Sequence, residues 1–484
     1  MNNPIRRLAL VMACMFASLL IASTWIQFFQ AGELRDKPGN RRTLLATYSR
    51  ERGSILVDGE AIARSEKVDD EFQYQRSYPG GPAYGHITGY YSFLYGSGGG
   101  LENSADELLT GDAPRLFFRR LGDLITARDP SGVNLELTID PRAQKAAERG
   151  LGNQRGAVVA LDPRSGAILA MVSHPEYDPN RLSGHDADEV TKAWNQLNKA
   201  SGKPMINRAI GGDLYPPGSV FKVITAAAAL SSGEYTEQSS LPGPAKLRLP
   251  QTNVDLPNAG GGSCNGGQTD LGLALERSCN TAFGWLGMQL GADAMREQAR
   301  KFGFGQQLNM PMPVTPSSVP EQINEPQEAL TAIGQYDVRV TPMQVAMVAA
   351  AVGNEGKLMK PYLIRQTRGA DLDVLDQTRP EQLGRAVDKG TAATLTHMME
   401  RVVESGTGTR AQIDGVRVAG KSGTAEHGEG RNPHAWFMAF APAQNPTIAV
   451  AVVVEDGGNA GSEAAGGRVS APIARDVMKA VIAP

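Results

Sequence analysis

The sequence predicts an α+β fold in which one antiparallel sheet is covered by helices. Near-continuous apolar runs bounded by Pro or Gly are typical of buried strands, and they occur at residues 156–162, 167–173, 416–420, 435–440 and 448–454. Apolar residues with helical spacing occur at residues 141–151, 223–230, 282–302, 341–352 and 471–482. Because strands lie at both ends of this region with helices between them, we expect a single sheet with helices packed on it.

The 484 residues are enough for two or three domains. Residues 141–484 form the domain just described, and residues 30–140 are predicted to form a smaller mixed module, the pedestal, with short strands near 54–57 and 134–138. Predicted loops are residues 96–100, 311–320 and 368–383. The chain is 41% hydrophobic and 20% charged, which is typical of a folded protein, and its net charge of −3 gives no indication of nucleic-acid binding.

The N-terminus predicts a membrane anchor. Arg6 and Arg7 precede an uncharged apolar run, Leu8–Phe29, that is long enough to cross a hydrocarbon core of about 30 Å. Arginines before the run place residues 1–7 in the cytoplasm and the rest of the chain outside the membrane. A cleaved signal peptide is the alternative, but its apolar core is usually about 7–15 residues long.

Two of the three cysteines fall in the extracytoplasmic part of the chain. Cys264 lies in a Gly-rich segment and Cys279 lies within a Ser-x-Asn motif. A disulfide persists outside the cytoplasm, so the two could be bridged, which would fix the Gly-rich segment beside that motif. Two free thiols, one of them buried as a small apolar residue, remain the alternative.

Ser219 and Lys222 form the first of three motifs that carry chemistry. A serine hydroxyl is a weak nucleophile that needs a base within hydrogen-bonding reach. Ser219 is predicted at the start of an Ala-rich helix after the turn Pro217-Gly218, and Lys222 lies on the same helix face. Apolar neighbours and a second cation would lower the pKa of Lys222 and make it a base. Taken alone, the motif is equally consistent with a helix N-cap serine and a surface lysine.

The second and third motifs supply partners for this pair. In Ser278-Cys279-Asn280, Ser278 could relay a proton and Asn280 could bind a substrate amide. The third motif, Lys421-Ser422-Gly423-Thr424, is predicted to follow a short strand. Lys421 would bind a substrate carboxylate, and Gly423 would allow close approach of the substrate backbone. Ser422 and Thr424 offer hydroxyls, and the N–H groups of Ser219 and Thr424 would form an oxyanion hole. Each tripeptide alone is common, but the three in this order are the pattern of serine enzymes that β-lactams acylate.

The six histidines are not needed for this chemistry. His427 and His434 flank a Gly-rich loop after the third motif and are interpreted as loop residues. No spacing of His, Cys and carboxylates indicates a metal, and no His–Asp partner for a serine triad is evident. We therefore expect no metal and no cofactor.

The motifs and several further segments resemble the class B penicillin-binding proteins over nearly the whole chain. The further segments are Arg52–Ile55 with Asp58-Gly59, Gly100–Glu102, Asn207–Ala209, Pro216–Val223, Ile333–Gln335 and Thr341–Gln344. The short pedestal and Lys421–Glu426 are most similar to the PbpA-type proteins of actinobacteria. Two departures are a small pedestal and Val57-Asp58-Gly59, which lacks the arginine often found there.

The resemblance implies a single-pass anchor, a non-catalytic pedestal of the dimerisation type and a domain of the serine β-lactamase/transpeptidase-like fold with an all-α subdomain. It implies a peptidoglycan D,D-transpeptidase acting in division or growth. Ser219 would be the nucleophile, with Lys222, Ser278 and Lys421 as the other catalytic residues. Expected partners are stem peptides of lipid II-derived strands, β-lactam antibiotics and a SEDS-family glycosyltransferase in the membrane.

Two other classes of function use or retain the same motifs. A D,D-carboxypeptidase or β-lactamase-type hydrolase would transfer the acyl group to water. β-Lactamases, however, are typically single-domain proteins without a pedestal. A penicillin-binding divisome scaffold would keep the pocket without needing its chemistry. The lifetime of the penicilloyl adduct separates a hydrolase from a transpeptidase, and tolerance of Ser219→Ala in cells would indicate a scaffold.

Overall fold

The computed structural model describes residues 3–30, 45, 48–114, 132–371, 373–428, 430–463 and 465–482. Helix α1 (Asn3–Thr24) continues as a π-helical turn, η1 (Trp25–Phe29), and its side chains are exposed along the whole length. This apolar helix of 27 residues, with mean hydropathy 2.1, can cross a membrane by length and composition. The rest of the predicted N-terminus and parts of the predicted pedestal (31–44, 46–47 and 115–131) lie outside the described residues.

The large domain is built on a five-stranded antiparallel sheet, as predicted. The strand order is β19–β20–β21–β7–β8, so β19 lies at an edge. The bounds are β7 (Gly156–Leu161), β8 (Ile168–His174), β19 (Ala419–Ala425), β20 (His434–Ala441) and β21 (Ile448–Val454). The predicted strand at 416–420 is wrong in position, because pairing with β20 continues from Ala419 to Ala425 and takes in the third motif.

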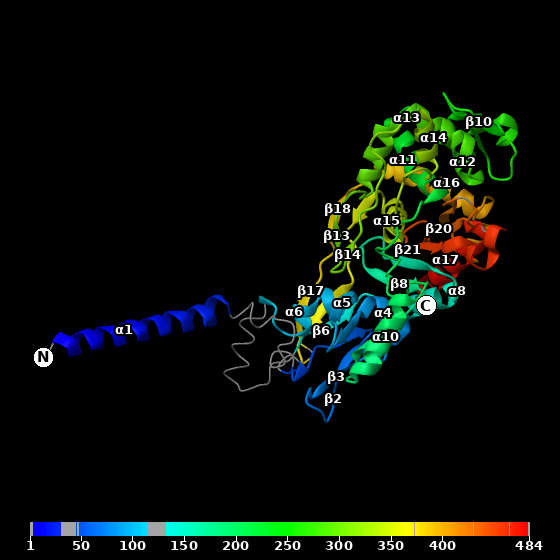
Figure 1. Ribbon diagram of the computed structural model, residues 1–484. Coiled ribbons are helices and arrows are strands. Elements are labelled where there is room, and N and C mark those ends of the chain that lie inside the picture. The colour runs from blue at the N-terminus through cyan, green and yellow to red at the C-terminus, as the bar shows by residue number, and fades with distance from the viewer. Residues whose placement is uncertain are drawn as a thin grey trace.

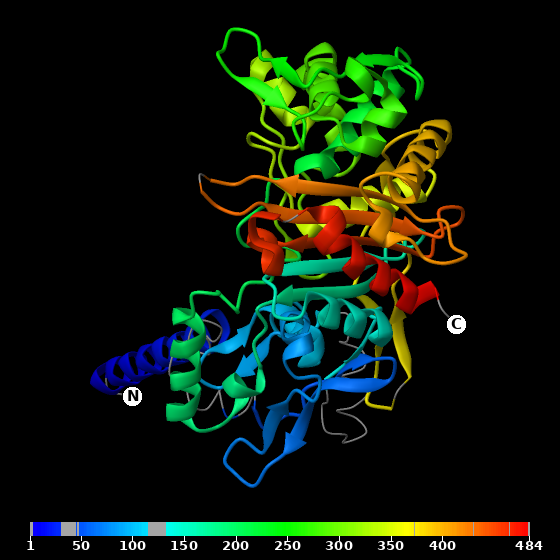
Figure 2. The same ribbon diagram turned by 90° about the vertical axis from the view of Figure 1, so that its right-hand side faces the viewer.

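Helices cover both faces of this sheet (Figure 2). Alternate strand residues point to opposite faces: Val158 and Val450 pack toward α8 (Pro141–Leu151) and α17 (Gly466–Ile482). On the other face, Val159 and Ala451 pack toward α11 (Lys222–Ser232) and α15 (Pro342–Gly353). Burial on both faces explains why these strands read as continuous apolar runs.

Local sequence fixes where two of these helices begin. The Asp140 side chain accepts hydrogen bonds from the first backbone N–H groups of α8, and Pro141 occupies the first helical position. Thr341 caps α15 in the same way, followed by Pro342. Both helices therefore start where the sequence predicts, and their apolar faces pack against the sheet.

An all-α subdomain lies beyond the β19 edge, at the top of Figure 1. It contains α11 and α12 (Leu271–Arg277), α13 (Asn280–Lys301) and α14 (Glu325–Ala332), with α16 (Lys389–Glu404) packed beside β19. The domain also contains small two-stranded antiparallel sheets: β9 (Ser240–Pro242) with β12 (Gln268–Asp270), β10 (Lys246–Arg248) with β11 (Asp255–Pro257), β13 (Leu308–Asn309) with β14 (Pro313–Val314), and β15 (Lys357–Met359) with β18 (Gln382–Arg385).

The pedestal is built on a six-stranded mixed sheet of order β17–β16–β6–β1–β2–β3. Four strands come from the predicted pedestal range: β1 (Ile55–Val57), β2 (Glu60–Lys67), β3 (Tyr74–Ser77) and β6 (Asn134–Leu137). The other two, β16 (Ile364–Arg368) and β17 (Val374–Gln377), return from far along the chain. The predicted loop at 368–383 is therefore wrong, because its residues complete this sheet.

Short elements lie around the pedestal strands, and α4 among them also contacts β8 of the large-domain sheet. They are η2 (Pro82–Tyr84), α4 (Gly85–Thr88), β4 (Tyr90–Ser92), β5 (Gly96–Gly98), α5 (Gly100–Ser104), α6 (Asp106–Leu109), α9 (Asn180–Ser183) and α10 (Ala187–Lys199). The predicted loop at 96–100 is thus also wrong: its first residues pair with β4 and its last begins α5.

The pedestal core holds a buried ionic cluster around Glu102. Arg52 Nε lies 2.6 Å from Glu102 Oε2, and Arg76 Nε lies 2.6 Å from Oε1. Tyr78 donates a hydrogen bond to the same carboxylate at 3.2 Å. Burial alone would raise the pKa of Glu102, but Arg76 and Arg52 outweigh it and hold that pKa below its usual value. The Arg52-Gly53 and Leu101-Glu102 segments singled out in the sequence meet here.

Candidate active site

Ser219 lies on a tight turn held by neighbouring backbone. It belongs to a 3₁₀ turn, η4 (Gly218–Phe221), immediately before α11, and not to the first turn of an α-helix as predicted. Gly218 has φ 55°, and its N–H donates to Gly334 O at 2.9 Å. A Cβ on Gly334 would lie 2.1 Å from Gly218 O, so only glycine allows this approach. Trp436 Nε1 donates to Pro216 O at 3.1 Å and holds the other side of the turn.

A cleft of about 580 Å³ opens in front of Ser219, between the all-α subdomain and the β19 edge. Six of the eight predicted site residues line it: Ser219, Ser278, Asn280, Ser422, Gly423 and Thr424. The three motifs, far apart in the sequence, therefore converge on one cavity. The two predicted lysines lie behind its wall.

Lys222 and Lys421 are both fully buried and meet at Ser278. Lys222 Nζ lies 2.8 Å from Ser278 O, 3.3 Å from Ser278 Oγ and 2.7 Å from Asn280 Oδ1. Lys421 Nζ donates to Ser278 Oγ and to Ser422 O, both at 2.9 Å. Among the described residues, no hydrogen bond joins Lys222 to the Ser219 hydroxyl, although the sequence placed them on one face. Lys421 is engaged by protein oxygens, which differs from the prediction that it faces a substrate carboxylate.

Both lysines have depressed pKa values. Burial, with the nearby ammonium of Lys421, holds the pKa of Lys222 well below its ordinary value. Burial alone lowers the pKa of Lys421 to about 7. The oxygens around them belong to hydroxyl, amide and backbone carbonyl groups, and no carboxylate is hydrogen-bonded to either lysine in the described chain. A neutral amine is therefore accessible at both positions, as general base catalysis requires.

Strand β19 presents its free edge to the cleft. Its residues alternate in direction, so Lys421 points inward, whereas the Ser422 hydroxyl lies 2.7 Å from Thr407 Oγ1 and Thr424 is exposed. A Cβ on Gly423 would lie 3.0 Å from both Trp436 Cβ and Val220 Cγ1. A side chain at this position would therefore crowd the packing of the strand on the nucleophile turn, and the role of Gly423 in close approach of the substrate backbone stays a prediction.

The nucleophile turn and the third motif are in direct contact. A Cβ on Gly218 would lie 2.5 Å from Thr424 O. Ser219 and Thr424 are therefore close enough to frame one substrate carbonyl between their backbones, which is the arrangement that an oxyanion hole needs.

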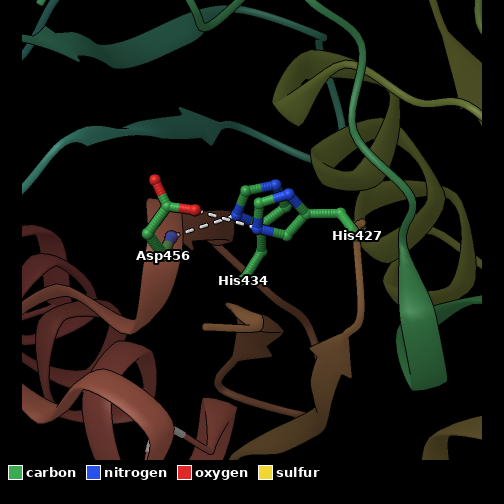
Figure 3. A group of neighbouring side chains, drawn as sticks. All are labelled: His427, His434 and Asp456. Carbon is green, nitrogen blue, oxygen red and sulfur yellow. Dashed lines mark hydrogen bonds and ion pairs between the residues drawn. The ribbon is translucent and has the colours of Figure 1, made fainter. Parts of the chain in front are cut away.

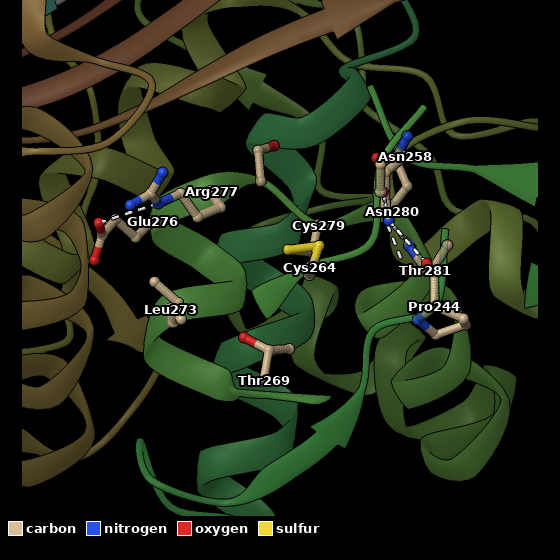
Figure 4. Close-up of a disulfide and its surroundings, with 12 residues drawn as sticks. Pro244, Asn258, Cys264, Thr269, Leu273, Glu276, Arg277, Cys279, Asn280 and Thr281 are labelled. Carbon is tan, nitrogen blue, oxygen red and sulfur yellow. Dashed lines mark hydrogen bonds and ion pairs between the residues drawn. A yellow bond between two sulfur atoms is a disulfide. The ribbon is translucent and has the colours of Figure 1, made fainter. Parts of the chain in front are cut away.

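The Ser278 segment is held by a disulfide and a strained backbone (Figure 4). Cys264 and Cys279 are bonded, closing a loop across 15 positions of sequence, and this decides between the two alternatives that the sequence left open. Ser278 has φ 61°, an uncommon conformation for a residue other than glycine. Asn280 Nδ2 donates to Pro257 O at 3.1 Å. These constraints hold the Ser278 hydroxyl between the two lysines.

Some residues of the site carried no motif in the sequence. Thr407 reaches Ser422 from the end of α16, and Gly466 at the start of α17 lies so close that a Cβ there would be 1.8 Å from Trp436 O. No sequence motif marks Thr407 or Gly466, because each contributes through a contact with a segment far away in the sequence. Gly334 lies in Ile333–Gln335, a segment that the resemblance had marked.

The fold and this site define a serine acyltransferase of the type that β-lactams acylate, and comparison with known proteins identifies the family. The profile "Penicillin binding protein transpeptidase domain" matches residues 156–479, and "Penicillin binding protein A dimerisation domain" matches residues 52–135. The chain belongs to the class B penicillin-binding proteins, as the sequence predicts.

Relatives from mycobacteria match this chain from end to end. It is 45% identical over 100% of its length to peptidoglycan D,D-transpeptidase PbpA of Mycolicibacterium smegmatis, covering 99% of that protein. It is 43% identical to PbpA of Mycobacterium tuberculosis, with the same coverage. The structure of penicillin-binding protein A from M. tuberculosis as a ceftriaxone acyl-enzyme has a TM-score of 0.87, at 43% identity and 90% coverage of this chain and 100% of that one. Its penicillin G acyl-enzyme has a TM-score of 0.84 at 42% identity, covering 89% of this chain and 99% of that one.

Proposed function

We propose that this protein is a peptidoglycan D,D-transpeptidase that works through an acyl-enzyme on Ser219. The observation that carries the proposal is the pair of buried, uncompensated lysines, Lys222 and Lys421, behind a cleft that Ser219 lines. Ser219 Oγ attacks the carbonyl of the penultimate D-alanine of a stem peptide, the peptide bond breaks, and terminal D-alanine leaves. An amine of a neighbouring stem peptide then attacks the ester, which forms the cross-link and restores the Ser219 hydroxyl.

Lys222 serves as the general base for the first step. As a neutral amine it donates two N–H bonds, to Ser278 O and Asn280 Oδ1, which are its shorter contacts. Its lone pair is then left for a hydroxyl proton. A small movement of the Ser219 side chain on substrate binding brings that hydroxyl into reach, since catalytic hydrogen bonds often tighten only in the complex.

Ser278 and Lys421 return the proton to the leaving group. Ser278 Oγ accepts from Lys421 at 2.9 Å and lies 3.3 Å from Lys222 Nζ, so one hydroxyl connects the two amines and also lines the cleft. A proton taken up by Lys222 passes through Ser278 to the departing D-alanine amine. Asn280, Ser422 and Thr424 bind substrate polar groups from the cleft walls.

Intact mass after penicillin treatment tests this function on the full chain in detergent. Wild type is expected to gain one penicillin mass and keep it, Ser219→Ala to gain none, and the control Ser231→Ala, at an exposed serine of α11, to behave as wild type. If wild type gained no adduct, Ser219 would not be an acylated nucleophile, and a scaffold role would be the remaining interpretation. Rapid adduct loss with penicillin turnover would indicate a hydrolase, the D,D-carboxypeptidase or β-lactamase alternative.

We also propose that this chemistry takes place outside the cytoplasm. Arg6 and Arg7 at the start of α1 favour a cytoplasmic N-terminus, which puts the cleft on the side where stem peptides lie. A SEDS-family glycosyltransferase in the membrane is the partner that would supply glycan strands, contacted through α1 and the pedestal. Protease accessibility of the large domain in sealed vesicles tests the orientation, and cross-linking from α1 tests the partner.

A further inference from the structure

Two histidines and an aspartate from three separate elements gather at the end of the β19–β20 loop, away from the lysines. His427 follows β19, His434 begins β20, and Asp456 lies in η7 (Glu455–Glu463) directly after β21. Figure 3 shows the two imidazole rings stacked with Asp456 at their edge. The ring centroids are 3.5 Å apart and the ring planes differ by 9°. The proposed catalysis uses none of these three side chains.

The ligating atoms of this cluster are close to one another. His427 Nε2 lies 2.9 Å from Asp456 Oδ1, and one ligand atom from each of the three residues lies within 4.8 Å of the others. The Asn432 carbonyl oxygen is 2.9 Å from the same His427 Nε2. Two imidazoles and a carboxylate therefore lie within reach of one ion, and a carbonyl oxygen lies beside one of the imidazoles.

We propose that His427, His434 and Asp456 bind a divalent transition metal ion, with Zn²⁺ the best fit. Zinc takes imidazole nitrogen and carboxylate oxygen at about 2.0–2.2 Å in tetrahedral geometry, which corresponds to ligand atoms about 3.3 Å apart. The observed ligand atoms lie within 4.8 Å of one another, so binding requires the two stacked rings to turn toward a common centre. Water or Asn432 O completes the fourth position. Hard cations such as Mg²⁺ prefer an all-oxygen set, so two imidazoles select against them.

One ring nitrogen of His434 already has a hydrogen-bond partner. The backbone N–H of Asp456 donates to His434 Nδ1 at 3.1 Å, so Nε2 is the nitrogen of this ring that is left for a metal ion.

Nearby positive charge is largely neutralised. Arg208 Nε lies 2.7 Å from Glu455 Oε1, and Arg155 lies 2.6 Å from Oε2 of the same carboxylate. Arg431 is the remaining cation close enough to affect His434. The Asp456 carboxylate is thus left to offset the charge of a bound cation.

A metal here would act on the rim of the catalytic cleft. Glu426, adjacent to His427, lines that cleft and also a neighbouring cavity of about 440 Å³ that His427, His434 and Asp456 line. An ion bonded to all three elements would tie the segment after the third motif to the ends of β20 and β21. The site is therefore structural, with an expected influence on substrate entry.

Titration calorimetry with Zn²⁺ and absorption spectroscopy with Co²⁺, on metal-stripped full chain in detergent, test the proposal. We expect one saturable site per chain, a Co²⁺ spectrum of four-coordinate type, and a rise in Tm of about 3 °C at a hundredfold excess over Kd. His427→Ala and Asp456→Asn should each weaken binding by at least about tenfold. The matched control is His397→Ala, because His397 faces a single carboxylate, Glu237, at 3.0 Å without a second imidazole.

Stoichiometric labelling by fluorescent penicillin shows that each variant is folded. Asp456→Asn keeps the size of its side chain, so its Zn²⁺ affinity still tests the site if His427→Ala unfolds. Absence of saturable Zn²⁺ binding in wild type, or equal affinity in wild type and Asp456→Asn, would overturn the proposal and leave a hydrogen-bonded cluster.

Discussion

Two buried cationic clusters, one in the pedestal and one behind the cleft, differ in what their cations meet. In the pedestal, Arg52 and Arg76 converge on the carboxylate of Glu102. Behind the cleft, Lys222 and Lys421 converge on the hydroxyl of Ser278. All four cationic side chains are nearly or completely inaccessible to solvent. The first pair is compensated by a negative charge, whereas the second is bonded only to neutral oxygens.

This difference separates a structural cluster from a reactive one. A carboxylate between two guanidinium groups stabilises every charge involved, and the pKa of Glu102 is accordingly lowered. Two buried lysines without a counter-charge disfavour the ammonium form, and their pKa values fall. A buried cation that is paired with a carboxylate therefore helps to hold the fold together. A buried lysine without a carboxylate partner becomes a base, at a cost in stability.

Removing the base should give the largest effect. Lys222→Met keeps an unbranched side chain but loses the amine, and we expect the second-order rate of penicillin acylation to fall by about 10²–10⁴-fold. Stopped-flow measurement with a fluorescent penicillin gives that rate. Lys192→Met, at an exposed lysine of α10, is the control and should change nothing. A rate within a few-fold of wild type would mean that Lys222 is not the base.

Breaking the compensated cluster should affect folding and not chemistry. Glu102→Gln removes the carboxylate that the two buried guanidinium groups share and leaves Arg52 only its ion pair with Asp106 at 2.8 Å. We expect a loss of about 3–5 kcal/mol in the free energy of unfolding. Glu66→Gln is the matched control, because its partner Arg64 lies on the exposed side of β2 and such pairs contribute under about 1 kcal/mol. Thermal unfolding measures the loss of stability, and the acylation rate of the folded fraction measures the chemistry. A slowed acylation rate per folded molecule would contradict the separation drawn between the clusters.

Sequence patterns predicted the parts of the site that are local. Ser219 with Lys222 and Ser278 with Asn280 each sit within a few residues of one another, so a motif identifies them. The sheet covered by helices on both faces could also be predicted from the sequence, because strands such as β21 are apolar on both faces and appear as continuous apolar runs.

Contacts between distant segments account for what the sequence did not predict. Strand β16 joins the pedestal because it pairs with β6, more than two hundred positions earlier, and no local pattern encodes that register. The sequence predicted that Lys421 faces a ligand. Its side chain points inward instead, because Lys421 belongs to strand β19 and pairs with β20. The cluster of His427 and Asp456 likewise exists only once β19 and β21 share a sheet.

The pH dependence of acylation tests whether the lysine behind the cleft is neutral. A general base must be unprotonated, so the wild-type rate should hold as the pH falls below 10 and should fall by about tenfold per pH unit only below the depressed pKa of Lys222. An ordinary lysine would instead lose activity steadily from about pH 10 downward. Acylation rates between pH 5 and 10 in buffers of constant ionic strength distinguish the two profiles.

Replacing the second lysine should give the smallest effect, a gain in stability. The folded-state pKa of Lys421, about 7, lies below the unfolded value near 10.5, so between these values the unfolded chain binds more protons and the stability of wild type rises with pH. Lys421→Met removes this penalty together with two hydrogen bonds, and we expect a net gain of about 1–2 kcal/mol at pH 7. The gain should shrink as the pH approaches 10, and acylation should be slowed because the proton path through Ser278 is lost. Lys301→Met, at an exposed lysine ending α13, is the control for thermal unfolding; a variant less stable than wild type at pH 7 would mean that Lys421 contributes more through its hydrogen bonds than its burial costs.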